Sequence, residues 1–257
     1  MGICARDPRQ LLPQLVGRLM TAGSTHYSQF RNDACFQLDK PALLPLRASL
    51  TPPGAEIARR AGHEDRITAL CLLLDGRLAS ASADRSIRLW DVATGRETTR
   101  IEGQEHWVNA LCQLPDGRLA SGSNDGTVRL WDVAASRKTA QLKGHAGGVR
   151  ALCMLPDGRL ASGCDDSEIR LWDMATGREV ARLDGGGPGV NALCLLPDGR
   201  LASASADRSI RLWDVATGRE TARLEVDASV WSLVAISANQ LVAGDRLGRL
   251  HWLEIVD

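Results

Sequence analysis

Histidine, serine and aspartate, the residue types of a hydrolase triad, recur at matching intervals in this sequence. Two sets follow one another with the same internal spacing: His63, Ser80 or Ser82, and Asp84, then His145, Ser162 and Asp166. A carboxylate that orients an imidazole beside a hydroxyl can perform acyl transfer by nucleophilic attack. That chemistry also requires an exposed nucleophile and donors for an oxyanion, and the sequence indicates neither.

The spacing of the two sets follows from an internal repeat. Tryptophan followed by aspartate recurs every 41 residues, at positions 90, 131, 172 and 213, and residues 78–98 are identical to residues 201–221. A fixed period of this length is typical of proteins built from stacked supersecondary units. The histidine sets therefore belong to a repeated structural unit.

Each unit contains four short runs of residues that favour strands. In the fourth unit these runs cover residues 190–196, 201–205, 209–213 and 219–224, with polar or glycine-containing turns between them. Such runs predict antiparallel strands joined by hairpins, which we name strands a, b, c and d. Four strands cannot cover both of their own faces, so the units must stack.

The repeated residues resemble those of the WD-repeat family of β-propellers. The matching positions are residues 119–125, 128–132, 144–145 and 155–158, and the resemblance covers about residues 54–257. It implies an all-β fold, a β-propeller of four-stranded antiparallel blades. A β-solenoid or another open repeat array is the alternative that repetition by itself leaves open.

In that family, the histidine, aspartate, serine and tryptophan of a blade form a structural hydrogen-bond network, which the resemblance implies here. Its positions in this sequence are His63, Asp84, Trp90, Asp125, Trp131, His145, Asp166, Trp172, Asp207 and Trp213. Gln104, Gly186 and Val226 stand in place of the other histidines, and Leu247 replaces the last aspartate. We therefore expect blades two, four and five to be less tightly held. We expect no enzymatic activity, catalytic residue, metal ligand or cofactor.

The chain is expected to divide into an N-terminal helical extension with a connector, residues 1–53, and the propeller, residues 54–257. Asp7 and Pro8 are suited to begin a short amphipathic helix at residues 9–20, and prolines make residues 40–54 an irregular connector. This first segment resembles the stretch before the WD repeats of bacterial signalling NTPases of the NACHT or NB-ARC type. The phosphate-binding loop of such an NTPase does not occur in the sequence.

A count of strands predicts how the ring closes. Residues 56–61 match strand d and precede the first strand a, whereas the fifth unit, which begins at residue 230, has no strand d after it. Pairing of residues 56–60 with residues 249–254 would complete five blades and remove an open sheet edge. Five blades closed in this way are the simplest arrangement, and closure through another copy is the alternative.

Composition restricts the compartment and the class of partner. Lys and Arg total 31, as do Asp and Glu, so the formal net charge is zero, which argues against nucleic acid or an anionic membrane as the partner. No apolar run is long enough to span a bilayer. Four of the seven cysteines share one strand-a position in successive units: Cys71, Cys112, Cys153 and Cys194. We expect them to be small buried apolar groups, too dispersed to share a metal ion, in a reducing, cytoplasmic compartment.

Binding is expected on the face formed by the d–a and b–c loops, where the units differ. The opposite a–b and c–d turns are nearly uniform. Their arginines offer a generic anion-binding alternative, weakened by an aspartate close to each one: Arg77, Arg118, Arg159 and Arg200. On the variable face the candidate partner-binding residues are Arg66, Glu105, His106, Trp107, Arg150 and Trp231. Trp107, in a predicted loop beside charged residues, has the make-up of a binding hot spot, and packing on the neighbouring blade is the alternative role.

The sequence thus predicts a non-catalytic WD-repeat scaffold that holds a protein or peptide partner on the d–a/b–c face. The alternative function is a sensor or ligand-recognition module of a bacterial signal-transduction NTPase whose motor domain is absent from this chain. The N-terminal helix distinguishes the two, because its apolar face packs either on the propeller or on a separate partner.

Overall fold

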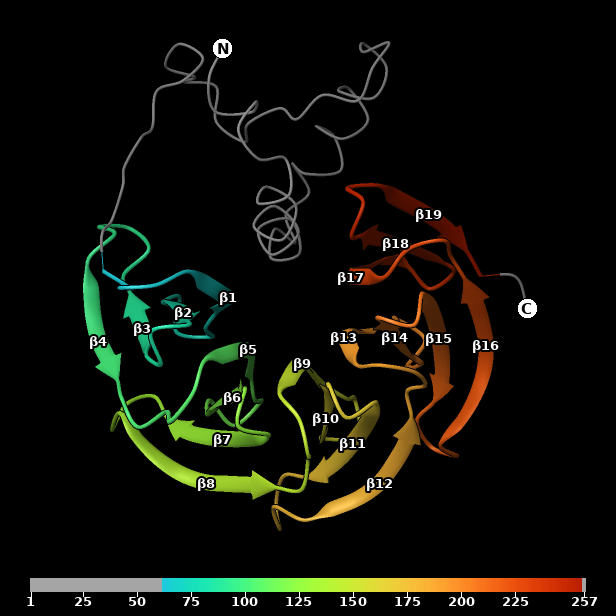
Figure 1. Ribbon diagram of the computed structural model, residues 1–257. Coiled ribbons are helices and arrows are strands. Elements are labelled where there is room, and N and C mark those ends of the chain that lie inside the picture. The colour runs from blue at the N-terminus through green and yellow to red at the C-terminus, as the bar shows by residue number, and fades with distance from the viewer. Residues whose placement is uncertain (1–61, 256–257) are drawn as a thin grey trace, which may run out of the picture. The chain divides into compact units, whose positions relative to one another are not determined.

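The computed structural model describes residues 62–255. The predicted N-terminal helix, the connector and the strand pairing of residues 56–60 lie outside the described residues. The described part is all-β and consists of five antiparallel sheets, each made of consecutive strands, which lie side by side along an arc (Figure 1). The predicted five-bladed propeller architecture is confirmed. Among residues 62–255, no helix has the length and apolar character needed to cross a membrane.

The strands follow the order expected from the repeat. Blade one contains β1 Ile67–Leu72, β2 Leu78–Ser82, β3 Ile87–Trp90 and β4 Glu97–Ile101. Blade two contains β5 Val108–Gln113, β6 Leu119–Ser123, β7 Thr127–Asp132 and β8 Arg137–Lys143. Blade three contains β9 Val149–Met154, β10 Arg159–Cys164, β11 Glu168–Asp173 and β12 Glu179–Asp184. Blade four contains β13 Val190–Leu195, β14 Leu201–Ser205, β15 Ser209–Asp214 and β16 Arg219–Glu225. Blade five contains β17 Val230–Ser237, β18 Gln240–Asp245 and β19 Leu250–Glu254.

An aspartate fastens the turn between strands b and c in the first four blades. Asp84 accepts hydrogen bonds from the backbone N–H and the hydroxyl of Ser86 at 2.9 and 2.7 Å. Arg85, between them, has a φ of 68° in the left-handed region, which a non-glycine residue adopts at a cost. The corresponding aspartates also accept the backbone N–H two residues ahead: Asp125, Asp166 and Asp207. The repeated aspartate therefore fixes the b–c turn that leads into the third strand of its blade.

The core lies between neighbouring sheets. The inner strands contact one another in the order β1, β5, β9, β13 and β17 (Figure 1). At the junction of blades three and four, Ile169 and Leu171 pack against Val190 and Trp213, and all four are at most 3% exposed. Burial of apolar surface at such junctions is the main favourable contribution to folding.

The succession of junctions ends at blades one and five. Within residues 62–255, the extensive contact between neighbouring inner strands does not recur between β17 and β1 (Figure 1). Blade five therefore has an exposed apolar face, which we call the trailing end face and define by Ile236, Leu250 and Trp252. Blade one has a second, the leading end face, defined by Ile67 and Val92.

Candidate functional site

The triad-like residues come together in blades one and three as a buried hydrogen-bond chain. In blade three, His145 Nδ1 lies 2.9 Å from Asp166 Oδ2, and its Nε2 lies 2.7 Å from Ser162 Oγ. The indole N–H of Trp172 donates to the same Oγ at 2.7 Å. Blade one repeats the arrangement, at 2.7–2.8 Å, with His63, Asp84, Ser80 and Trp90.

The donor and acceptor types of the four side chains determine which group donates at each hydrogen bond in blade three. An indole can only donate, so the Ser162 hydroxyl accepts from Trp172 and donates onward to His145 Nε2. His145 then donates its Nδ1–H to Asp166. Burial lowers the pKa of His145, and the neighbouring Asp166 carboxylate only partly offsets this, which favours the neutral imidazole that the chain requires. Burial disfavours the ionised form of Asp166, but hydrogen bonds from the Ala146 N–H and from His145 hold its pKa below the usual range.

This geometry gives the serines a structural role. Ser80 and Ser162 are at most 1% exposed, and each hydroxyl is engaged by both a tryptophan and a histidine. A substrate would have to open the blade to reach them. The hydrogen-bond chain instead links strand b, strand c, the b–c turn and the d–a loop. Such satisfied buried networks favour a single arrangement of the core.

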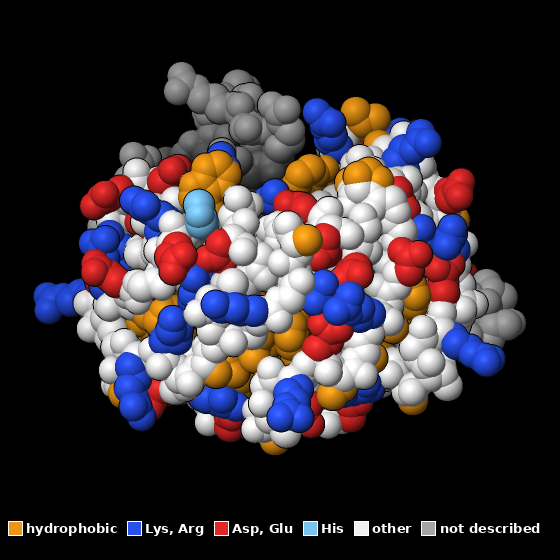
Figure 2. All heavy atoms as spheres, turned by 60° about the horizontal axis from the view of Figure 1, so that its bottom comes forward, with side chains coloured by type: hydrophobic (Ala, Val, Ile, Leu, Met, Phe, Trp, Pro, Cys, Tyr) orange, Lys and Arg blue, Asp and Glu red, His pale blue; other side chains and the backbone are white. Residues whose placement is uncertain are grey.

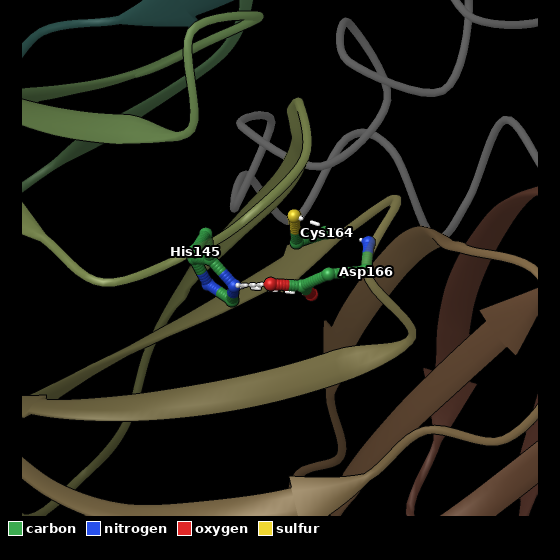
Figure 3. Close-up of side chains that lie close together, drawn as sticks. All are labelled: His145, Cys164 and Asp166. Carbon is green, nitrogen blue, oxygen red and sulfur yellow. Dashed lines mark hydrogen bonds and ion pairs between the residues drawn. The ribbon is translucent and has the colours of Figure 1, made fainter.

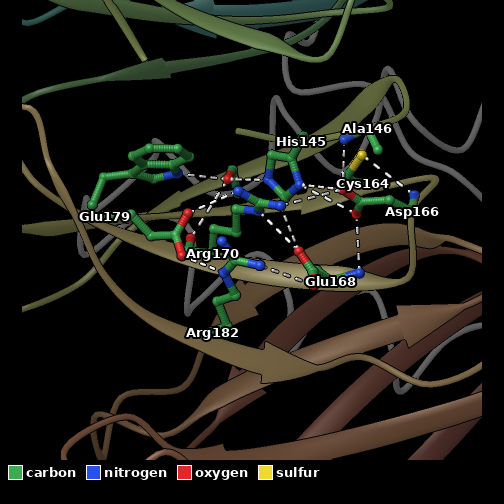
Figure 4. Close-up of polar contacts among 10 residues, drawn as sticks. His145, Ala146, Cys164, Asp166, Glu168, Arg170, Glu179 and Arg182 are labelled. Atoms are coloured by element: carbon green, nitrogen blue, oxygen red, sulfur yellow. Dashed lines mark hydrogen bonds and ion pairs between the residues drawn. The ribbon is translucent and has the colours of Figure 1, made fainter. Parts of the chain in front are cut away.

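In each blade with a histidine network, an arginine on strand c contacts a glutamate of strand d. Arg170 lies 2.8 Å from Glu179 and 2.7 Å from Glu168 in blade three (Figure 4). Arg88 lies 2.7 Å from Glu97 in blade one. Both arginines are buried, and a buried guanidinium requires carboxylate partners to offset its lost hydration.

Blade two uses the equivalent arginine differently, at the position where the repeat pattern lacks a histidine. Arg129 donates to Gln104 Oε1 at 2.9 Å and to Asp125 Oδ2 at 2.8 Å. Gln104 Nε2 donates to Ser121 Oγ at 2.6 Å, and the Trp131 indole donates to the same oxygen at 2.8 Å. A glutamine and an arginine together therefore occupy the place of one histidine.

Blade four has a third arrangement at the same position. Arg211 Nη2 lies 2.9 Å from Asp207 Oδ2, and Nη1 donates to the carbonyl oxygen of Gly185. A Cβ atom at Gly186 would overlap with that guanidinium, so the glycine leaves room for the arginine. In the sequence, Gly186 stands at the repeat position of the histidine. In the structure, Arg211 of strand c occupies the space that the histidine side chain fills in blades one and three.

Blade five contains a polar cluster that sequence reasoning missed. Asp245, whose side chain is fully buried at the end of β18, lies 2.7 Å from Arg249 Nε and 2.9 Å from His251 Nε2. Arg249 also lies 2.7 Å from Asp227 of the preceding loop. Burial opposes ionisation of Asp245, but hydrogen bonds from His251 and Arg249 hold its pKa well below the usual range. The repeat pattern places the turn aspartate of each blade at the position of Leu247, two residues after Asp245. The cluster around Asp245 therefore has no counterpart in the repeat pattern.

Two groups of described side chains combine the residue types of metal ligands. They are His145, Cys164 and Asp166 (Figure 3), and Asp227, Asp245 and His251. In the first group, burial raises the pKa of Cys164 to about 12, which keeps the sulfur a thiol rather than the thiolate that binds metals. Its Sγ accepts the backbone N–H of Asp166 at 3.4 Å. In the second group the Arg249 guanidinium contacts both carboxylates. Hydrogen bonding therefore accounts for both groups.

The strand-a cysteines are free thiols and lie half-buried, less deeply than the sequence predicts. Burial raises the pKa of Cys112 and of Cys153 to about 12. These groups are therefore protonated at neutral pH and behave as small, weakly polar packing residues.

A pocket of about 440 Å³ opens between the loops of blades one and two. It is lined by Glu64, Asp65, Ala83, Asp84, Arg85, Glu105, His106 and Trp107. The Trp107 side chain is exposed, and the Arg66 guanidinium lies 4.6 Å from the centroid of its ring, within the range of a cation–π interaction. The Trp107 carbonyl oxygen accepts the Asn124 N–H at 2.9 Å. The indole thus lies at the wall of a pocket whose charged lining residues are mostly acidic.

The structure gathers four of the six predicted partner-binding residues and separates the other two. Arg66, Glu105, His106 and Trp107 lie at or beside the pocket. Arg150 instead contacts Asp165 at 2.7 Å in blade three. Trp231 is an exposed residue of β17 in blade five.

The arginines of the uniform turns are engaged by their own aspartates. The distances are 2.5–2.7 Å for Arg77, Arg118, Arg159 and Arg200. Arg118 and Arg159 also donate to backbone carbonyl oxygens of the next blade. The face drawn in Figure 2 mixes acidic and basic side chains without a field of one sign. These contacts weaken the anion-binding alternative.

Asp125→Ala should lower the free energy of unfolding more than Asp166→Ala does. Loss of Asp125 leaves the guanidinium of Arg129, which is 1% exposed, with the exposed Glu105 carboxylate at 3.9 Å as its remaining acidic contact, and breaking such a buried pair costs about 3–5 kcal/mol. Loss of Asp166 leaves a neutral imidazole and the Ala146 N–H without their acceptor, and stranding uncharged groups of this kind costs about 1–3 kcal/mol each. Urea titration of the two variants measures the difference. A smaller loss for Asp125→Ala would show that Asp125 does not hold the arginine in place.

His145→Gln should make stability less sensitive to acid. Burial lowers the folded-state pKa of His145 below the unfolded value of about 6.5, so the unfolded chain binds more protons and stability falls as the pH drops below that value. Gln104 shows that glutamine can serve this position without titrating. Melting midpoints at about pH 7.5 and pH 5.5 should differ less in His145→Gln than in the wild type. His106→Gln, at an exposed residue, is the control, and equal differences in all three proteins would refute the assignment.

Comparison with known proteins matches segments of this sequence to two family models. Residues 54–91, 95–132 and 136–173 match the family model of the WD domain, G-beta repeat. Residues 189–255 match the model of the TEP-1 C-terminal beta-propeller. No curated protein matches. A solved structure titled "Structure of U3-55K" is similar with a TM-score of 0.71 and 24% identity, over 76% of this chain and 63% of that one, a likeness that concerns the fold alone.

Proposed function

Because the chain carries WD40 repeats that form a β-propeller, an architecture typical of protein-interaction scaffolds, we propose that it binds a protein or peptide partner without catalysis. The partner occupies the d–a/b–c face, at the pocket between blades one and two. The observation that carries this proposal is the exposed Trp107 indole at the wall of that pocket, with the Arg66 guanidinium over its ring. Large aromatic residues held rigidly at a concave surface are the commonest anchors of binding energy.

The charges of the pocket favour a basic partner segment. Glu64, Asp65 and Glu105 are exposed carboxylates in its lining, and Arg85 is the guanidinium among the lining residues. Asp84 adds a fourth carboxylate, although its hydrogen bonds to His63 and Ser86 engage it within the blade. A lysine or arginine side chain of the partner can enter beside Trp107 and meet these carboxylates. Charge complementarity of this kind orients a partner and speeds its association.

Trp107→Ala should abolish capture of basic peptides from a random peptide library displayed on beads, while Trp107→Phe keeps part of it. Arg178→Ala, at an exposed turn residue on the opposite side of blade three, is the matched control and should bind like the wild type. The wild-type protein should enrich peptides rich in lysine and arginine, and binding should weaken as salt is added.

Two outcomes would contradict this proposal. Enrichment of acidic peptides would refute the assigned charge preference. Retention of binding by Trp107→Ala, with loss in Arg178→Ala, would place the binding surface on the other side of the propeller. Thermal melting of each variant separates loss of binding from loss of the fold.

A further inference from the structure

The trailing end face carries apolar residues that the rest of the chain buries. Trp252 pairs with Val242 across the sheet as Leu212 pairs with Ala202 in blade four, so the two residues occupy the same repeat position. Trp252 is 74% exposed, whereas its counterparts in the other blades are at most 5% exposed: Leu89, Leu130, Leu171 and Leu212. Leu250 is 45% exposed, whereas the residues at its position are at most 3% exposed: Ile87, Val128, Ile169 and Ile210.

The leading end face shows the same contrast from the other side of the junction. Ile67 begins strand a of blade one and is 52% exposed. The residues that begin strand a in the following blades are 0% exposed: Val108, Val149, Val190 and Val230. Val92 is likewise exposed, whereas Val133, one repeat later, is buried at the junction of blades one and two.

The two end faces are therefore the two halves of one junction. The trailing face presents the positions that each earlier blade uses to receive its successor, and the leading face presents the positions that each later blade inserts. Repeat arrays that end in water carry polar residues on their terminal units. Here the terminal positions hold isoleucine, valine, leucine and tryptophan, which are the residues of a covered surface.

We propose that a second copy of this chain covers these faces. The trailing end face of one copy packs against the leading end face of the next, as adjacent blades do within a copy. Four junctions between neighbouring blades already pair these two kinds of surface within one chain. Every copy carries one trailing end face and one leading end face. This contact is heterologous, so it joins copies head to tail into a closed ring or a longer series. The inference goes beyond partner binding at the pocket and does not depend on it.

Two variants, each altered at one end, test the proposal. Trp252→Glu places a charge on the trailing face, and Ile67→Glu places one on the leading face. Both positions are solvent-exposed in a single copy, so neither change disturbs a blade core. Val180→Glu, at an exposed residue of β12 in blade three, is the matched control. Circular dichroism and thermal melting establish that each variant is folded.

Molar mass, measured by light scattering after size exclusion over a range of concentrations, gives the readout. The wild type and Val180→Glu should exceed the mass of one chain, 27.7 kDa, increasingly so at higher concentration. Each end variant alone should have the mass of a single chain, because every junction in that sample has one altered half.

An equimolar mixture of the two end variants is the decisive sample. It contains one intact trailing face and one intact leading face, so it should form dimers of about 55 kDa that grow no further. A wild type that stays at the mass of one chain at all concentrations would overturn the proposal and would mean that the chain covers its own end faces. A mixture that stays monomeric while the wild type associates would also overturn it, because association would then use another surface.

Discussion

A four-stranded sheet in this protein cannot bury its own apolar face, and the contact between neighbouring sheets resolves this constraint. The first three junctions pack the branched residues of one blade against a valine and a tryptophan of the next, and the fourth packs them against Val230 and Leu241. The fit is close enough to restrict residue size. A Cβ at Gly122 would lie 2.7 Å from Val149, and one at Gly163 would lie 2.6 Å from Val190. The 41-residue period follows from this packing, because each unit must present the same two surfaces to its neighbours.

Within a blade, a second constraint is the satisfaction of buried polar groups. The serine that accepts the tryptophan indole needs a partner on its other side, and the buried arginine of strand c needs acceptors. Blades one and three engage both groups with a histidine and the glutamates that contact the arginine, whereas blade two uses Gln104 with Arg129. In blade four Arg211 enters the space that Gly186 leaves free. One position in the fold is thus occupied by three sets of residues, of which those of blades one, two and three contact the serine, which is why a hydrolase-like set of residue types can be purely structural.

The fold and the chemistry of the site differ in how far the sequence predicts them. The spacing of Trp90, Trp131, Trp172 and Trp213 predicts the blades, because the repeat leaves few alternatives for how such units stack. The partner of an arginine is not predictable in the same way. Arg88 and Arg129 occupy the same repeat position, but the residue in a distant loop decides whether the guanidinium turns to strand d or to the b–c turn. Asp245 escaped prediction because it lies at a position that is serine in the first blade, and the exposure of Trp252 depends on where the succession of blades ends.

Stability resides in the junctions between blades, so a blade with two junctions is more stable than a blade with one. Native-state hydrogen exchange, followed by mass spectrometry at a concentration where the molar mass is that of one chain, measures the stability of each blade. The amides of β10 and β11, in the blade at the middle of the series, should exchange slowest. Those of β2 and β18, in the end blades, should exchange through openings of lower free energy. Equal protection in all five blades, or slowest exchange in an end blade, would mean that the junctions do not determine the stability of the blades.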